Sequence, residues 1–165
     1  MNWKHIPILV GAATLFVAAN ASTQEVALPG RALQKTSMKT QNTFLALDPT
    51  FKDAFTPTTV SCPSTGTCTL HIEVSTQFFG LSSSEALTIN VKVDGGATLP
   101  AQSITVAGVA NSTPGYGLES RTFQWIKNEV EAGSHTVDVE MRVTGGASPV
   151  ATAVLRVLKI NIYKP

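Results

Sequence analysis

Histidine is the side chain most often used for acid–base chemistry near neutral pH, and two of the three histidines, His71 and His135, lie beyond residue 21. His71 lies in an alternating run of polar and apolar residues, and His135 follows a Gly-Ser turn signal. Neither lies in a G-x-S-x-G sequence, which marks the nucleophile of many hydrolases. Because a catalytic triad can assemble from distant residues, a small secreted hydrolase remains one alternative, although we predict that the protein is not an enzyme.

Paired carboxylates are the next candidates for acid–base chemistry. Asp138 and Glu140 are two residues apart on a predicted strand, which places both on one face at roughly 6–7 Å. Glycosidases use carboxylates at such a separation. Charges that alternate along the wet face of a strand also serve solubility alone, and Lys92 and Arg142 could neutralise this pair. We therefore predict no catalytic role for it.

Metal ligation has little support in the sequence. No spacing of cysteines and histidines fits a zinc site. Asp48 and Asp53 could bind calcium together with loop carbonyls, because calcium prefers oxygen ligands, but the chain has no acidic cluster of the D-x-D-x-D kind. We predict no metal and no cofactor, with calcium at these two aspartates as the alternative.

The N-terminus predicts export. Lys4 precedes an apolar run over residues 6–19, and Ala19-Asn20-Ala21 is a small-x-small cleavage site; together these features indicate a secretory signal peptide. We predict cleavage after Ala21, which gives a secreted or periplasmic mature chain that begins at Ser22. The apolar run covers about 14 residues, whereas about 20 span a bilayer. We therefore expect no membrane insertion of the mature chain, with an uncleaved anchor as the alternative.

Two cysteines, Cys62 and Cys68, enclose the sequence P-S-T-G-T. Disulfides persist in exported proteins, and the proline and glycine between the cysteines suit a tight reversal. We predict a structural Cys62–Cys68 disulfide, which stabilises the fold by about 2 kcal/mol in a loop-entropy description. A redox-active pair is the alternative, but its usual C-x-x-C spacing is not present.

Aromatic side chains provide the main signal for ligand binding. Trp125 shares the parity of Phe123 on a predicted strand, which favours a core position; an exposed ring would instead be a stacking platform for a sugar. Tyr116 lies between two glycines in a polar loop, where an aromatic ring suits ligand contact or packs over the end of the core. Asn111 begins the glycosylation sequon N-S-T in the same loop. We predict Tyr116, Asn111 and Trp125 as candidate ligand-binding residues.

Apolar and polar residues alternate with a period of two along much of the chain, which is typical of strands with one dry and one wet face. The clearest example is Cys68–Phe79. Residues 58–62 are expected to form a hairpin with it, closed by the disulfide. Further strands are predicted at residues 43–47, 86–94, 103–107, 121–127, 137–143 and 150–163.

The last predicted strand changes parity partway, and two phenylalanines lie in the loop after residues 43–47. The residues of its two phases are Ala151, Ala153, Leu155 and Val157, and then Leu158, Ile160 and Ile162. A slip of one residue in a period-two pattern predicts a β-bulge, here near Val157. We expect Phe51 and Phe55 to fill one end of the core.

About eight or nine short strands, with turn signals between them and no helical periodicity, predict an all-β fold. The expected architecture is a single antiparallel β-sandwich of jelly-roll or immunoglobulin-like topology. We divide the chain into a signal peptide (residues 1–21), an extended arm or linker (22–41) and the sandwich (42–165). The arm has no sustained period, and we expect it to be a linker or to add to a sheet edge.

Composition and charge narrow the class of function. Without Lys4, 11 of the 12 basic residues remain against 11 acidic residues, and a neutral chain argues against nucleic acid and anionic membranes as partners. We predict a secreted, non-catalytic β-sandwich for binding or assembly: adhesion, carbohydrate contact or a subunit of a surface structure. Oligomers are possible through strand edges. The alternative is an accessory module that docks another extracellular protein through its N-terminal arm.

Overall fold

The computed structural model describes residues 30–81, 84–98, 103–107, 118–145 and 151–164. The predicted signal peptide and the first part of the predicted arm lie outside these residues. All regular structure in the described part is strand. The ten strands are β1 Ala32–Gln41, β2 Leu45–Leu47, β3 Lys52–Asp53, β4 Thr58–Cys62, β5 Cys68–Phe79, β6 Glu85–Val93, β7 Ser103–Ala107, β8 Glu119–Val130, β9 Gly133–Gly145 and β10 Ala151–Lys164. Over the same residues, no helix has the length and apolar character needed to cross a membrane.

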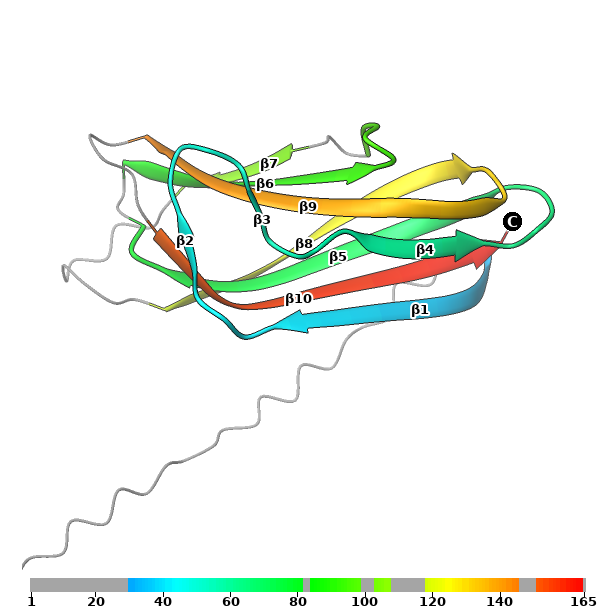
Figure 1. The fold of residues 1–165 in the computed structure, drawn as a ribbon, viewed down its shortest axis with the longest axis horizontal. Helices are drawn as coiled ribbons and strands as arrows, with labels where there is room; N and C mark the ends of the chain where they lie inside the picture. Colours follow the sequence, from blue (N-terminus) through cyan, green and yellow to red (C-terminus); the bar gives the residue numbers. More distant parts are fainter. Residues whose placement is uncertain (1–29, 82–83, 99–102, 108–117, 146–150, 165) are drawn as a thin grey trace, which may run out of the picture.

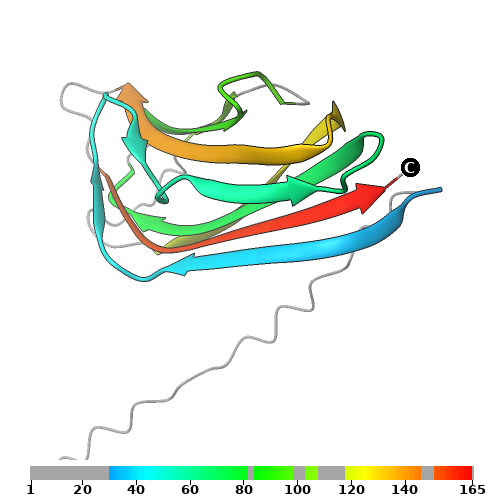
Figure 2. The same ribbon diagram turned by 45° about the vertical axis from the view of Figure 1, so that its right-hand side comes forward.

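The strands form two antiparallel sheets that pack face to face, which confirms the predicted β-sandwich (Figure 1, Figure 2). Sheet A has the order β1-β10-β5-β8. β2 pairs with the other end of β10, on the same side as β1, so β1 and β2 share one strand position in the sheet, which we call a lane. Sheet B has the order β3-β9-β6-β7, and β4 continues the lane of β3 along β9. Each sheet therefore has four lanes.

The lane order decides between the two predicted topologies. Numbered along the chain, the lanes of sheet A run 1-8-3-6 and those of sheet B run 2-7-4-5. This is the jelly-roll arrangement, in which almost every connection passes from one sheet to the other. In the immunoglobulin arrangement, by contrast, the first two strands are neighbours in one sheet.

The core forms between the two sheets, where the apolar side chains on the inner face of each sheet pack together. Most inward residues are at most 3% exposed, and the inward residues predicted for β5, β6, β9 and most of β10 are buried. This buried set includes Leu70, Ile72, Val74, Leu87, Ile89, Val91, Val137, Val139, Met141, Val143, Leu158, Ile160 and Ile162. Phe55 joins the core at 3% exposure, whereas Phe51 is 37% exposed, so only one of the two phenylalanines fills it.

The Cys62–Cys68 disulfide is present, but the predicted hairpin around it is wrong. β4 pairs with β9 in sheet B, whereas β5 pairs with β10 and β8 in sheet A. The bond, with its Cα atoms 5.8 Å apart, therefore ties the two sheets together. Alternation along a strand identifies its buried face but not its neighbour, because both sheets of a sandwich present the same pattern.

The bulge in β10 occurs earlier than predicted and changes which residues face inward. The register of β10 against β5 shifts between Ala153 and Arg156. As a result, Arg156 points into the sandwich and is 3% exposed, while Leu155 and Val157 are only partly buried. The prediction that Leu155 and Val157 share the inward phase of Ala153 is therefore wrong.

Arg156 donates hydrogen bonds to three backbone carbonyls. Its Nε bonds the oxygen of Ala54 at 3.0 Å, and its Nη1 bonds the oxygens of Thr43 at 2.9 Å and Ala153 at 3.1 Å. Thr43 lies between β1 and β2, Ala153 precedes the bulge, and Ala54 follows β3 in the opposite sheet. Burial lowers the pKa of Arg156 from its usual range. One guanidinium thus connects both sheets where the strand lanes break.

Residues 32–41, predicted as the end of an arm or linker, form β1. This strand pairs antiparallel with β10 along the edge of sheet A, from Ala32 opposite Lys164 to Gln41 opposite Arg156. The register shifts between Leu33 and Lys35, which marks a bulge. These ten residues are therefore an integral strand of the sandwich, as in the arm alternative that adds to a sheet edge.

Replacing Arg156 by methionine should destabilise the fold strongly. The variant keeps the apolar stem but leaves three carbonyls without their donor, and each unsatisfied buried group costs roughly 1–3 kcal/mol. We expect a loss of at least about 3 kcal/mol in the free energy of unfolding, measured by urea titration. Arg156→Lys should lose less.

The matched control is Arg121→Met, which removes a half-exposed guanidinium that pairs with Glu119 at 3.1 Å. Exposed ion pairs contribute less than about 1 kcal/mol. Equal losses at positions 121 and 156 would contradict the structural role of Arg156.

Candidate functional site

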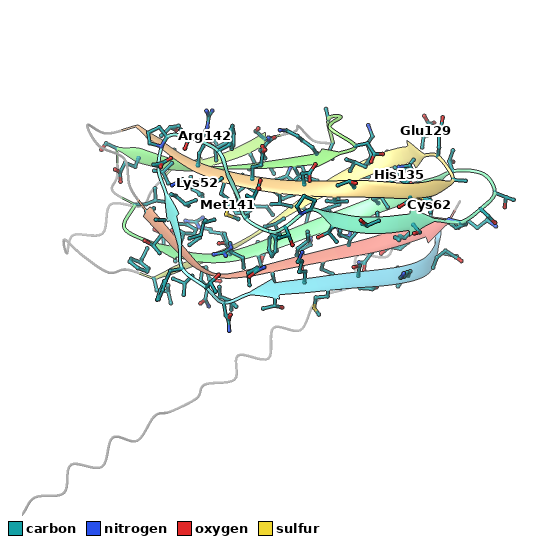
Figure 3. The ribbon with its side chains drawn as sticks, viewed as in Figure 1. Lys52, Cys62, Glu129, His135, Met141 and Arg142 are labelled. Carbon is teal, nitrogen blue, oxygen red and sulfur yellow. A yellow bond between two sulfur atoms is a disulfide. The ribbon has the colours of Figure 1, made fainter. Side chains whose placement is uncertain are left out.

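A hollow of about 270 Å³ opens at the disulfide end of the sandwich. It forms where β6 ends and where the chain passes from β8 to β9. We call it the end hollow. The residues that line it are Val93, Asp94, Lys127, Glu129, Val130, Glu131 and His135. Figure 3 shows Glu129, His135 and Cys62 together at this end, with Arg142 and Lys52 toward the other.

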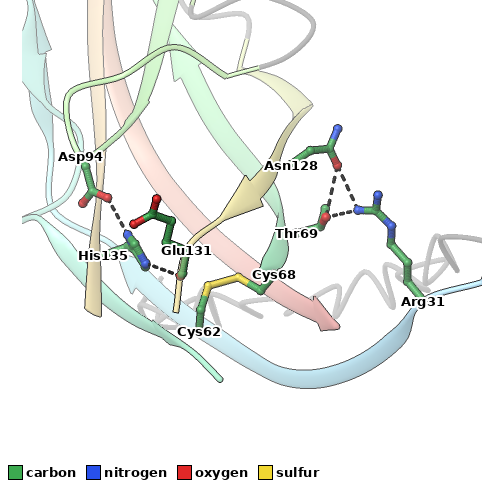
Figure 4. The surroundings of a disulfide bond; sticks show 8 residues. All are labelled: Arg31, Cys62, Cys68, Thr69, Asp94, Asn128, Glu131 and His135. Atoms are coloured by element: carbon green, nitrogen blue, oxygen red, sulfur yellow. Dashed lines mark hydrogen bonds and ion pairs between the residues drawn. A yellow bond between two sulfur atoms is a disulfide. The ribbon is translucent and has the colours of Figure 1, made fainter. Parts of the chain in front are cut away.

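Asp94 and His135 form the polar centre of the end hollow (Figure 4). His135 Nδ1 lies 2.6 Å from Asp94 Oδ2, and its Nε2 lies 2.8 Å from the carbonyl oxygen of Glu131. The other oxygen of Asp94 accepts a hydrogen bond from the Thr136 amide at 2.8 Å. Because both partners of the imidazole are acceptors, the arrangement is fully satisfied only when both ring nitrogens carry a proton.

The two pKa values shift in the directions that this arrangement requires. The hydrogen bond with Asp94 raises the pKa of His135 above its ordinary value of 6.5, against the opposing effect of partial burial. The hydrogen bonds from Thr136 and His135 lower the pKa of Asp94 below 3.8. A general base needs a free ring nitrogen, and here both nitrogens are occupied. The pair is therefore suited to a structural ion pair, which joins the end of β6 to the start of β9.

Two residues of the end hollow have left-handed backbone. Asp94 has φ 50° and Glu129 has φ 54°, and they are the non-glycine residues with positive φ in the described part of the chain. Asp94 belongs to the predicted Asp-Gly-Gly turn, where this conformation is common. Glu129 has no such sequence signal, and its backbone costs about 1 kcal/mol. The sequence therefore indicated the left-handed backbone at Asp94 but not the one at Glu129.

The charges of the end hollow do not amount to a metal site. Asp94, Glu129 and Glu131 supply three carboxylates, against the cations Lys127 and protonated His135. Lys127 Nζ donates to the carbonyl of Ala97 at 3.0 Å. Among the residues that the structure describes, no three His, Cys, Asp or Glu side chains are grouped so that they could hold a metal ion.

The predicted carboxylate pair on β9 is tied into a surface network. Glu140 accepts hydrogen bonds from Asn90 at 2.8 Å and from Lys92 at 3.0 Å. Burial alone would raise the pKa of Glu140, but the bonds from Lys92 and Asn90 outweigh it and lower the pKa. A catalytic acid needs the opposite shift. The predicted neutralisation by Lys92 is therefore present at Glu140.

Asp48, one of the two aspartates considered for calcium, serves the turn between β2 and β3. It accepts a hydrogen bond from the Thr50 amide at 2.9 Å and pairs with Lys52 at 2.7 Å. The bonds from Lys52 and Thr50 lower its pKa to about 2. Asp53 lies opposite Glu140 in the register of β3 and β9. The carboxylate of Asp48 is thus already used by its own turn.

The structure places the predicted aromatic and histidine candidates apart from one another. Trp125 is 0% exposed and packs 6.3 Å from the ring of Phe123, so it belongs to the core and presents no face to a sugar. Tyr116 and Asn111 lie outside the described residues. His71 is 4% exposed, on the outer face of sheet A, where the prediction of a wet face is wrong. Arg31 covers part of this face by donating to Thr69 (Figure 4).

A second feature, missed by the sequence reasoning, is an apolar lane at the open edge of sheet A. Five large hydrophobic side chains of the described part are exposed, and three lie on or just after β1: Leu33 at 41%, Met38 at 65% and Phe44 at 75%. We call these three residues with β1 the edge surface. The residues of β1 show no regular alternation of apolar and polar side chains, so the sequence does not mark it.

Comparison with protein-family models and with curated protein sequences finds no match. Among solved structures, the chain is similar to one titled "Structure of infectious bursal disease virus Gx strain", with a TM-score of 0.43 and 10% sequence identity. The similarity covers 81% of this chain and 38% of that one. A likeness this weak says nothing about ligand or partner.

Replacing Asp94 by asparagine should lower the pKa of His135 toward 6.5, because the charged partner is lost while the side chain keeps its size. The pKa is measured by NMR titration of the imidazole. The control is Asp138→Asn, which removes a carboxylate from β9, the strand that carries His135. This variant should leave the pKa of His135 unchanged. A titration of His135 that is identical in the Asp94→Asn variant would contradict the ion pair.

The same pair fixes the sign of the pH dependence of stability. His135 contributes below 6.5, and its contribution is lost as the pH rises through its raised pKa; Asp94 contributes above 3.8, and its contribution is lost as the pH falls through its lowered pKa. The stability difference between the native protein and Asp94→Asn should therefore be largest between pH 3.8 and 6.5. A difference that increases above this window would contradict the assignment.

Proposed function

We propose that this protein is an exported, non-catalytic β-sandwich that works by assembly with protein, through strand addition at its edge surface. The observation that carries the proposal is the concentration of exposed hydrophobic side chains on and beside β1, at 41%, 65% and 75% exposure. In the described residues, β1 ends the strand order of sheet A. An edge strand carries unpaired N–H and C=O groups that can pair with another chain.

The chemistry of the described polar groups supports contact over catalysis. Both ring nitrogens of His135 have acceptors, Glu140 is held by Lys92, and Asp48 is held by Lys52. These are the groups on which a hydrolase or calcium site was considered. Trp125 is buried, so carbohydrate contact has lost one of its three candidates, and Tyr116 and Asn111 remain predictions.

Export is the second part of the proposal. The N-terminal sequence supports it, and so does the disulfide between Cys62 and Cys68, because such bonds persist in oxidising compartments. When the full chain is expressed with export machinery, the recovered protein should begin at Ser22. N-terminal sequencing or intact mass measures this. Recovery of a chain that retains residues 1–21 in the cytoplasm would contradict export.

Site-specific photo-cross-linking tests the contact. A photo-reactive amino acid in place of Met38 should form protein adducts in intact producing cells, because this position lies at the centre of the edge surface. The matched control replaces Leu118, which is 59% exposed and precedes β8. Absence of adducts at position 38, or equal adducts at position 118, would overturn assembly through the edge surface.

A further inference from the structure

We infer that the partner at the edge surface is a second copy of this chain, paired β1 to β1 in antiparallel fashion about a two-fold axis at Met38. This inference rests on the proposed function and specifies its partner. A two-fold axis through an edge strand presents the same patch from both subunits, so the patch must be complementary to itself. Three features of β1 meet that condition.

The first feature is the division of side chains between the two faces of β1. Its register against β10 sets Met38 opposite Lys159 and Thr36 opposite Asn161, on the outer face of sheet A. Ser37 lies opposite Ile160, which is 0% exposed and belongs to the inner face. A pair of β1 strands that continues the sheet must match outer residues with outer residues.

The second feature is the position of the two lysines of β1. A pair centred on Ser37 would place Lys35 opposite Lys39 of the second copy, and a pair centred on Lys39 would place two copies of Lys39 together. Like charges directly opposite each other are destabilising. A pair centred on Met38 sets Lys39 opposite Ser37 and Lys35 opposite Gln41, so it avoids both clashes.

The ammonium of Lys39 also points away from the open edge. Its Nζ donates to the carbonyl of Thr56 at 2.9 Å and to the hydroxyl of the same residue. Thr56 follows β3 in sheet B, so this lysine closes the side of the sandwich between the sheets. Its bonds to Thr56 therefore hold the ammonium toward sheet B.

The third feature is the match of apolar groups. Registers centred on Thr36 or Thr40 also separate the lysines, but they set Met38 opposite the polar residues Gln34 or Asn42. A register centred on Gln41 would set Met38 opposite Phe44, but Phe44 lies beyond the end of β1. Among pairings within β1, the register centred on Met38 buries this side chain, now 65% exposed, against an apolar partner. The same register matches Thr36 with Thr40 on the outer face, and cross-strand threonine pairs are favourable.

The ends of the edge surface fit the same arrangement. In an antiparallel pair, the Leu33 end of one strand lies beside the Phe44 end of the other, so the other two hydrophobic residues of the edge surface come to the same ends of the pair. The bulge between Leu33 and Lys35 limits regular pairing to residues 35–41. The paired strands would join two copies of sheet A into one continuous sheet.

Cysteine scanning of the purified mature chain tests the register. The Met38→Cys variant should form a disulfide-linked dimer under mild oxidation, and peptide mapping should locate the bond at position 38. A mixture of Thr36→Cys and Thr40→Cys chains should form the mixed dimer faster than either chain forms its own. The control is Thr122→Cys on the outer face of β8, which is exposed and should form no disulfide-linked dimer.

The oligomeric state in solution is the second measurement. The native chain should have twice the monomer mass by light scattering, whereas Met38→Glu should be monomeric and fully folded; Leu118→Glu should remain dimeric. A monomeric native chain, or cross-linking that is as fast at position 122 as at position 38, would overturn the inference. If the native chain is monomeric while position 38 cross-links to a different protein in cells, the proposed function stands and the second copy is excluded.

Discussion

The sandwich depends on one buried cation, Arg156. Its guanidinium bonds carbonyls that lie 102 and 113 residues away in sequence, at Ala54 and Thr43, as well as the nearby Ala153. These are the points at which the chain breaks between β1 and β2, breaks between β3 and β4, and bulges in β10. Regular strand pairing cannot satisfy backbone groups at such breaks, so the side chain of Arg156 supplies the missing donors.

The opposite end of the sandwich is fixed by different means. The Cys62–Cys68 disulfide and the β8–β9 connection both join sheet B to sheet A there, and the Asp94–His135 pair adds a link from β6 to β9. With the two ends held in this way, the long sides of the sheets remain, and β1 forms one of them. A rigid edge that exposes Met38 suits association by strand addition, because little order has to be gained on binding.

The polar groups follow a common principle. Several ionisable side chains that would suit chemistry, among them His135, Glu140 and Asp48, use their charge to join neighbouring strands or to hold a turn. A carboxylate or imidazole that is satisfied by the fold is a poor acid or base, because reaction would break the bonds that position it. The surface that remains is defined by shape and apolar contact, which is why the proposed function rests on the edge surface.

The sequence by itself determined the strands and their buried faces. Period-two alternation, which depends only on local backbone geometry, located β5 at Cys68–Phe79 and β7 at Ser103–Ala107 with the bounds that the structure has. The same alternation indicated the β-sandwich and the core position of Trp125, and the short spacing of Cys62 and Cys68 indicated the disulfide. Only the tertiary structure decided which strands are neighbours, because alternation carries no information about partners; the predicted hairpin at Cys62 failed for this reason. The inward turn of Arg156 and the edge position of β1 were likewise set by contacts between residues more than 100 positions apart, which no local pattern records.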